Sequence, residues 1–464
     1  MSEQKETQVF PPPYRPKKWS ATPLADMRNT LKRLGLWHHN QQLGRRWAVG
    51  CVALEITQRC NLDCSLCYLS EHSQAVQDIP LEEIKRRIDA IYTWYGEGTD
   101  VQVTGGDPTL RDPDELELIV RWIAEKKMRP TLMTNGIRAS RALLTKLCEA
   151  GLVDVAFHVD TTQGYKKYPD EVSLNQLRAR YLERVAGLPL TVMFNTTIHP
   201  GNIKQIPDLM HFFARHAQQI RTVSFQLEAD TGRGVHSVEN QLSRDTVLAL
   251  INSACASPLN YQAAEIGHPD CNRYALTLVV NGKIWNFYDD SALTGDVLRH
   301  STALLWHRNQ PLRSMLGFMK WLCFNPKLAV RLTRWALKKA WQMRRDLFAC
   351  RGKISTLSVF THSFMPGDCL DCERVEACSF MTMTRDGPVS MCVLNAERDR
   401  YIYQPVQLSS GKWWSPTNDG NVHYMEAAAP QVLRWVPEEQ LPTRLLKGKA
   451  RNRRLAKGVR DTSS

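Results

Sequence analysis

Residues 60–68, CNLDCSLCY, place Cys60, Cys64 and Cys67 on one short segment. Three thiolates at this spacing can converge on one soft metal centre. A structural zinc site would need a fourth cysteine or histidine, and His72 is close enough in the sequence to supply it. An iron–sulfur cluster held by three cysteines would instead leave one iron open to a bound molecule. The segment therefore predicts a metal centre and leaves both alternatives open.

A second group of cysteines has the spacing C-x2-C-x5-C-x13-C, formed by Cys369, Cys372, Cys378 and Cys392. A turn at DGPV (386–389) between short strands would return the last cysteine towards the third. The four thiols could close a zinc site or hold an auxiliary iron–sulfur cluster. Cys271, in the segment HPDC, could join this centre or bind another.

The elements that position the first group alternate between short apolar runs and amphipathic runs. Strands are expected at 52–57, 101–105, 130–135, 153–160, 190–198 and 221–229, and helices at 80–95, 112–127, 140–151, 173–187 and 206–217. This alternation predicts an α/β fold of parallel strands. Six strands are fewer than the eight of a closed barrel, so we expect a partial (β/α)6 TIM-type barrel with a C-terminal cysteine-rich α+β extension.

Polar residues follow each expected strand, where parallel βα folds place their sites. They are the segment from Arg59 to Cys67, then Gly105-Gly106-Asp107, Asn135-Gly136, Asp160, Asn195 and Glu228. Each also has a purely structural interpretation: the glycines could form a tight turn, Asn135 could bend a loop and Asp160 could cap a turn. His158, on the same strand face as Asp160, could relay a proton or simply pack.

CNLDCSLCY after a strand, and VTGGDPTL after the next, resemble the radical S-adenosylmethionine (SAM) superfamily over residues 48–235. The resemblance implies a [4Fe-4S] cluster bound by Cys60, Cys64 and Cys67, with SAM on the fourth iron. Reductive cleavage of SAM would release a 5′-deoxyadenosyl radical that abstracts hydrogen from unactivated carbon.

By the same resemblance, Tyr68 would lie near the adenine, and Gly105, Gly106 and Asp107 would form the turn that meets the methionine ammonium. This turn departs from the superfamily's Gly-Gly-Glu-Pro, because Asp107 has a shorter reach than glutamate. Asn135, Asp160 and Asn195 are candidates for ribose and carboxylate contacts. No residue is assigned as the catalytic one.

The C-terminal part resembles the auxiliary-cluster extensions of the SPASM type, and more loosely a lipid-acting branch that includes tetraether lipid synthases. The second similarity rests on FQLEADTGRG, HPDC, an acid-free apolar helical insert and MCVLNAERDRYI. The rubredoxin-like cysteines of those synthases have no counterpart here, so their reaction is not carried over.

The 464-residue chain carries a formal charge of +13, which favours an anionic partner. Residues 301–345 contain ten Lys and Arg and four Trp but no Asp or Glu. Within them, Leu328, Leu332 and Trp335 share one helical face, and Arg331, Arg334 and Lys338 fall on another. This insert could pack on the catalytic domain, or it could lie on an anionic membrane or grip a lipid-like substrate.

These features divide the chain into six segments. They are a leader (1–47), the radical SAM core (48–235), a linking region with a hairpin (236–300), the basic helical insert (301–350), the cysteine-rich domain (351–440) and a basic tail (441–464), expected to be mobile. No apolar run approaches the ~20 residues of a membrane span, and the first residues lack the apolar core of a secretory signal. We therefore expect a cytoplasmic location, with contact to the inner membrane face as an option.

The sequence favours a radical SAM enzyme that acts on a lipid or another apolar small molecule, with flavodoxin or ferredoxin as electron donor. Modification of a peptide or protein is the second hypothesis. A zinc-stabilised membrane-surface binding protein without redox chemistry is the third. Nucleic acid is not an expected partner, because no recognisable binding module is present.

Overall fold

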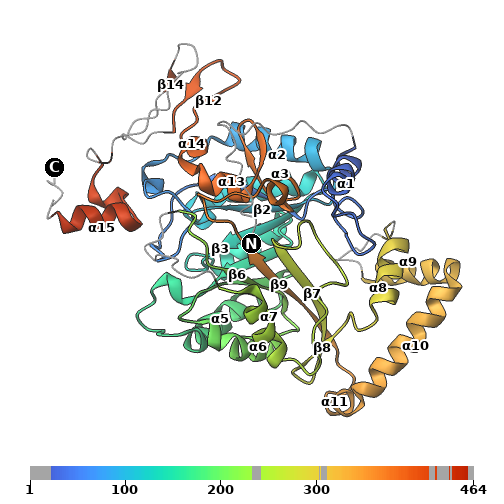
Figure 1. The fold of residues 1–464 in the computed structure, drawn as a ribbon. Helices are drawn as coiled ribbons and strands as arrows, with labels where there is room; N and C mark the ends of the chain where they lie inside the picture. Colours follow the sequence, from blue (N-terminus) through green and yellow to red (C-terminus); the bar gives the residue numbers. More distant parts are fainter. Residues whose placement is uncertain are drawn as a thin grey trace, which may run out of the picture.

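The computed structural model describes residues 22–232, 242–302, 304, 311–416, 424–425, 438 and 441–457. Parts of the expected leader (1–21), of the linking region (233–241), of the insert (303, 305–310), of the cysteine-rich domain (417–423, 426–437, 439–440) and of the tail (458–464) lie outside these residues. An eleven-stranded sheet forms the centre of the molecule, with strand order β11-β10-β1-β2-β3-β4-β5-β6-β9-β7-β8 (Figure 1).

The first six strands of this sheet run parallel and lie in sequence order, as predicted. They are β1 (Cys51–Thr57), β2 (Asp100–Gly105), β3 (Arg129–Thr134), β4 (Asp154–His158), β5 (Thr191–Ile198) and β6 (Ile220–Leu227). Since β1 pairs with β10 and β6 pairs with β9, rather than with each other, the barrel does not close over these six strands. The expectation of a partial barrel is confirmed.

Five helices connect these strands and pack against one another in chain order. They are α2 (Leu81–Tyr95), α3 (Pro113–Glu125), α4 (Arg141–Glu149), α5 (Glu171–Val185) and α6 (Ile206–Arg215). Alternate residues of β1, such as Val52, Leu54 and Ile56, share the main hydrophobic core with Ile84 and Ile88 of α2. The residues between them face the opposite side of the sheet.

The C-terminal half contributes strands to the same sheet. β9 (Ser355–Ser363) runs parallel to β6, and β10 (Phe380–Thr384) runs parallel to β1 and antiparallel to β11 (Gly387–Ser390). Two predicted hairpins are confirmed: β10–β11 at DGPV, and β7 (Asn272–Val280) with β8 (Lys283–Asn286), whose turn residues Asn281 and Gly282 both have positive φ. The strands expected in a cysteine-rich extension therefore complete the core sheet.

Smaller elements surround this sheet. They are the helices α1 (Pro23–Arg33), α7 (Arg244–Ser253), α8 (Ser291–His300), α12 (Cys372–Glu376), α13 (Met391–Ala396) and α14 (Arg398–Ile402), and a three-stranded sheet of β12 (Val406–Gln407), β13 (Trp413–Trp414) and β14 (Tyr424–Met425). The described residues also contain five short 3-10 turns, among them η2 (Pro108–Leu110), η3 (Thr161–Gln163) and η6 (Thr443–Leu445). Leu394 of α13 packs with Ala53 of β1, so the C-terminal helices cover the inner face of the first strand.

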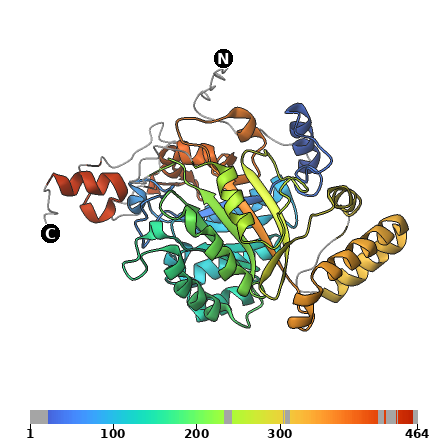
Figure 2. The same cartoon turned by 60° about the horizontal axis from the view of Figure 1, so that its bottom comes forward.

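The basic insert forms three helices that project from the body as an arm: α9 (Pro311–Phe324), α10 (Pro326–Gln342) and α11 (Arg344–Ala349) (Figures 1 and 2). No helix within the described ranges is both long and apolar enough to cross a bilayer.

The expectation of a mobile tail is wrong for residues 441–457. This segment forms η6 and α15 (Gly448–Ala456), and Leu441, Leu446 and Ala450 bury their side chains against Ala75. The apolar residues among its many cations explain why the segment folds onto the body.

Candidate radical SAM site

The three cysteines of the first group lie on the loop that follows β1, at the carboxyl end of the parallel strands. Cys60, Cys64 and Cys67 are partly exposed thiols outside any disulfide. Two hydrogen bonds anchor their backbone: the side-chain amide of Gln74 donates to the Cys60 carbonyl (2.6 Å), and the Ser65 N–H donates to the Thr162 carbonyl (2.8 Å). The loop is thereby tied to the end of β4.

The two glycines after β2 pack directly on the backbone that leads into this loop. The Gly106 N–H donates to the Thr57 carbonyl (2.9 Å), and the Asp107 N–H donates to the Arg59 carbonyl (2.8 Å). A Cβ atom at Gly105 would collide with the Thr57 carbonyl oxygen, and one at Gly106 with that of Arg59. Both positions therefore require glycine so that the two backbones can approach.

Tyr68 connects the cysteine loop with this turn. Its hydroxyl donates to the Gly105 carbonyl (2.8 Å), and the guanidinium of Arg398 lies 4.8 Å from the centre of its ring. Burial is the main cause that raises the pKa of Tyr68 above its ordinary value, so the hydroxyl is a proton donor at neutral pH. The expected adenine contact of this residue stays a prediction.

Asp107 is fully buried, and its carboxylate already accepts hydrogen bonds from other groups of the protein. It accepts hydrogen bonds from the N–H and hydroxyl of Thr109, from the Thr134 hydroxyl and from the Asn135 N–H. The side-chain amide of Asn135 in turn donates to Asn61 in the cysteine loop (2.7 Å). These contacts join the ends of β2 and β3 to the loop.

Asp160, which is buried, and His158, which is partly exposed, form a second connection at the ends of β4 and β5. The His158 Nε2 lies 2.7 Å from the Asp160 carboxylate, which also accepts from the N–H groups of Thr162 and Thr197. Burial alone would lower the pKa of His158, but Asp160 raises it above the ordinary value. Asn195 pairs with His158 in the strand register and is almost fully buried.

Glu228 follows β6, and its N–H donates to the Ile198 carbonyl (3.0 Å). Partial burial raises the pKa of its carboxyl. Beside it, Gly232 lies against the backbone of Cys67 and Tyr68, where a Cβ would be 2.6 Å from the Cys67 carbonyl oxygen. The loop after β6, the last of the six parallel strands, therefore contacts the cysteine loop that follows β1, the first of them.

His72 does not join the three cysteines. Its ring lies 3.9 Å from the Asp399 carboxylate and 3.5 Å from that of Glu438. Within the described ranges, no three His, Cys, Asp or Glu side chains converge closely enough to hold a single metal ion.

The second group of cysteines converges only in part. The thiols of Cys271, Cys378 and Cys392 lie close enough to interact electrostatically. Arg374 Nε donates a hydrogen bond to the Cys271 sulfur (3.3 Å). Burial raises the pKa of Cys271 to about 11 and that of Cys392 to about 12, and the nearby guanidinium opposes this. Cys369 is exposed, and Cys372 begins the short helix α12. Cys271 thus lies with the group, as its sequence position had suggested.

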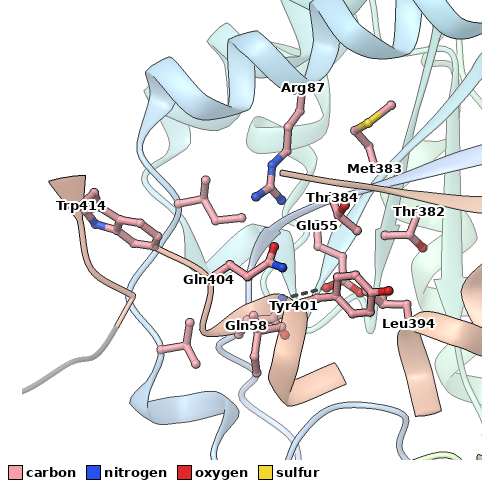
Figure 3. Close-up of a pocket in the computed structure, with 13 residues that line it drawn as sticks. Glu55, Gln58, Arg87, Thr382, Met383, Thr384, Leu394, Tyr401, Gln404 and Trp414 are labelled. Carbon is pink, nitrogen blue, oxygen red and sulfur yellow. Dashed lines mark hydrogen bonds between the residues drawn. The ribbon is translucent and has the colours of Figure 1, made fainter. Parts of the chain in front are cut away.

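Sequence reasoning missed a buried ion pair beside the site. Arg398 of α14 donates to both carboxylate oxygens of Glu55 on β1 (2.9 and 3.0 Å), and Gln58 donates to the same carboxylate (2.8 Å). Figure 3 shows Glu55 and Gln58 lining a pocket between β1, β10 and α14, with the Arg87 guanidinium pointing into it. A charged residue inside the apolar strand VALEIT was the one available signal.

Comparison with known proteins agrees with the fold of this region. Residues 54–213 match the Radical SAM superfamily. The 7,8-dihydro-6-hydroxymethylpterin dimethyltransferase of Methanocaldococcus jannaschii is 28% identical over 189 residues, covering 39% of this chain and 36% of the relative. The GTP 3′,8-cyclase of Streptomyces coelicolor is 32% identical over 196 residues, covering 39% and 54%. A PqqA peptide cyclase of Methylobacterium nodulans is 26% identical over 168 residues, covering 35% and 42%.

The chain spans about a third to a half of the length of these curated relatives. Among solved structures, the FeFe-hydrogenase maturase HydG from Carboxydothermus hydrogenoformans aligns with a TM-score of 0.35 and 14% identity, covering 50% of this chain and 55% of that one. Members of the superfamily are enzymes that use a [4Fe-4S] cluster and SAM for radical-based reactions. Residues 54–213 of this chain therefore form a radical SAM domain.

Proposed function

We propose that this chain binds a [4Fe-4S] cluster through Cys60, Cys64 and Cys67 and abstracts hydrogen from an unactivated carbon of its substrate. The observation that carries the proposal is the packing of the Gly105–Gly106 backbone against the cysteine loop, which places a three-thiol segment beside a close-packed peptide cradle. When bound, the cluster and SAM supply an electron and a 5′-deoxyadenosyl radical.

The side chains of this region hold the loop in place for that chemistry. Asp107 fixes the ends of β2 and β3, Asn135 binds Asn61 in the loop, and Tyr68 joins the loop to the Gly-Gly turn. Asn195 remains our candidate for a ribose or carboxylate contact. Asp160 serves the site indirectly, because its carboxylate is committed to His158, Thr162 and Thr197.

Replacing a cluster ligand tests this assignment directly. Cys64→Ala should reduce iron and sulfide content and abolish 5′-deoxyadenosine formation from SAM and dithionite, because the remaining two thiols cannot hold the cluster. Cys323→Ala, at an exposed cysteine of α9, is the matched control and should retain both. Unchanged iron content and turnover in Cys64→Ala would contradict the proposal.

We also propose that Cys271, Cys378 and Cys392, with Cys369 and Cys372, hold an auxiliary iron–sulfur cluster. Mutual proximity of the first three thiols and the guanidinium of Arg374 support it, since a cation beside them stabilises thiolates. Cys378→Ala should lower the iron and sulfide count by one cluster while sparing some SAM cleavage, and Cys372→Ala should block product formation. An iron count equal to that of the wild type would exclude Cys378 as a ligand.

The substrate we favour is a lipid or another apolar small molecule, because the basic arm exposes large apolar side chains. The alternative is a peptide or protein, supported by the similarity to PqqA peptide cyclases. The radical SAM domain counts against the third hypothesis, a zinc-stabilised binding protein. The proposed reaction would need an electron donor of the flavodoxin or ferredoxin class. We propose a cytoplasmic location for the enzyme, at the inner membrane face.

A further inference from the structure

The arm formed by α9 and α10 leaves large apolar side chains in solvent. On α9, Leu312, Met315, Leu316 and Met319 are 53–70% exposed, and Phe324 at its end is 75% exposed. On α10, Val330, Leu337 and Trp341 are 52–68% exposed. Large apolar side chains exposed together on two neighbouring helices mark a surface that another molecule covers.

One side of α10 packs against the body of the protein. Lys339 is buried and lies 2.8 Å from Asp289, and Arg331 lies 2.5 Å from Asp296 on α8. The Trp335 indole N–H donates to Asp289 (2.7 Å), and its ring lies 5.0 Å from that of Phe287. Arg331, which the sequence places on the basic face of the insert, and Lys339 therefore pair with acidic groups of the body, so neither belongs to the surface argued below.

The opposite side of α10 combines apolar and basic residues without acids. Val330, Leu337 and Trp341 are separated by seven and four residues, so they lie on one face. Lys327, Arg334 and Lys338 are exposed, and none has an acidic partner within salt-bridge distance in the described part of the chain. We call Val330, Leu337 and Trp341 with these three cations the outer face of α10.

We propose that the outer face of α10, together with the apolar stripe of α9, docks on the surface of an anionic phospholipid bilayer. Apolar side chains would enter the boundary between headgroups and acyl chains, and the flanking cations would contact lipid phosphates. The complete absence of Asp and Glu from residues 301–345 matches a negatively charged surface rather than a protein of mixed charge. Neither helix spans the bilayer.

This proposal extends the proposed function and rests on it in one respect. Docking on a bilayer would bring the enzyme to an apolar substrate that is dissolved in the membrane. Its physical basis is independent of the metal centre. Vesicle binding therefore tests it without any radical chemistry.

The experiment uses the full chain in flotation with vesicles of phosphatidylcholine, with and without phosphatidylglycerol. The wild type should float with the anionic vesicles and much less with the neutral ones. Leu337→Gln/Trp341→Gln should weaken binding about tenfold, and Arg334→Gln/Lys338→Gln should weaken it several-fold. These side chains are exposed, so the variants should fold as the wild type does.

Arg180→Gln/Arg215→Gln removes two exposed cations from α5 and α6 and is the charge-matched control, which should bind like the wild type. Cys64→Ala should also bind, which separates this proposal from the failure of the cluster assignment. Equal flotation of the wild type and the Leu337→Gln/Trp341→Gln variant would overturn the proposal. So would a wild-type dimer that does not float and becomes monomeric in that variant, because a second copy would then cover this surface.

Discussion

His158 and Asp160 form an ion pair whose contribution to stability depends on pH. Burial alone would raise the pKa of Asp160, but His158 and the donors around it hold that pKa far below its usual range. His158 moves in the opposite direction, since Asp160 raises its pKa. Both shifts favour the charged pair in the folded chain, so both contribute stability.

The contribution of this pair should depend on pH in a defined window. Stability from the depressed Asp160 is present above its unfolded pKa of about 3.9, and stability from the raised His158 is fully present below its unfolded pKa of about 6.5. It is lost as pH rises through the raised pKa of His158. The free energy of unfolding in urea should therefore fall as pH rises above about 6.5 and through the raised pKa of His158, and less so in His158→Gln. His211→Gln, at an exposed histidine of α6, should keep the wild-type dependence, and an identical fall in His158→Gln would refute this account.

At this scale the sequence predicted positions better than roles. The polar residues after each strand do gather at one edge of the sheet, as parallel topology requires. Their hydrogen-bond partners could not be predicted, because Asp107 finds Thr134 and Asn135 on the next strand, and Asp160 finds Thr197 on another. The Asp107 carboxylate thus has a structural role, and the contact of its turn with SAM stays a prediction.

Among the elements, α15 contacts the cysteine loop at Asp63. The Gly448 N–H donates to the Asp63 carboxylate (3.1 Å), and Arg451 lies 3.4 Å from the same group, one residue before Cys64. The Lys447 N–H donates to the Glu71 carbonyl, and Arg453 lies 3.0 Å from the Glu71 carboxylate. The C-terminal segment therefore braces the loop from outside.

Removing this segment should loosen the loop without unfolding the sheet. In a chain that ends at residue 440, amide hydrogen exchange of residues 62–71 should become faster, since these backbone groups lose their external contacts. A chain that ends at residue 457 retains α15 and is the control. Unaltered exchange in the shorter chain would show that the cysteine loop holds its conformation alone.

The strands and helices of the core could be predicted from the sequence, whereas the pairing of strands that lie far apart in the sequence could not. Apolar and amphipathic runs alternate clearly from residue 51 to 229, and the structure contains each expected strand and helix. β9 and β10 are equally plain as strands, but nothing local specifies that they pair with β6 and β1. Such pairing depends on burial of both faces, a property of the assembled sheet.

On the scale of the whole molecule, Glu55 and Arg398 join the radical SAM domain to the C-terminal half. Residue 55 lies within the domain at 54–213, and Arg398 follows it by 343 residues. Both side chains are almost fully buried, and Arg398 also covers the ring of Tyr68. The pair therefore fixes the extension beside the residue that links the cysteine loop to the Gly-Gly turn.

Breaking this pair from one side should be more costly than removing it entirely. Arg398→Met leaves the Glu55 carboxylate buried without its counter-ion, which should lower the free energy of unfolding by about 3–5 kcal/mol. Glu55→Gln/Arg398→Met removes both charges, so its loss should be clearly smaller than the sum of the two single losses. Urea unfolding of the four proteins measures this coupling. Strict additivity would mean that the two halves dock through the shared sheet alone, with Arg398 contributing only its contact with Tyr68.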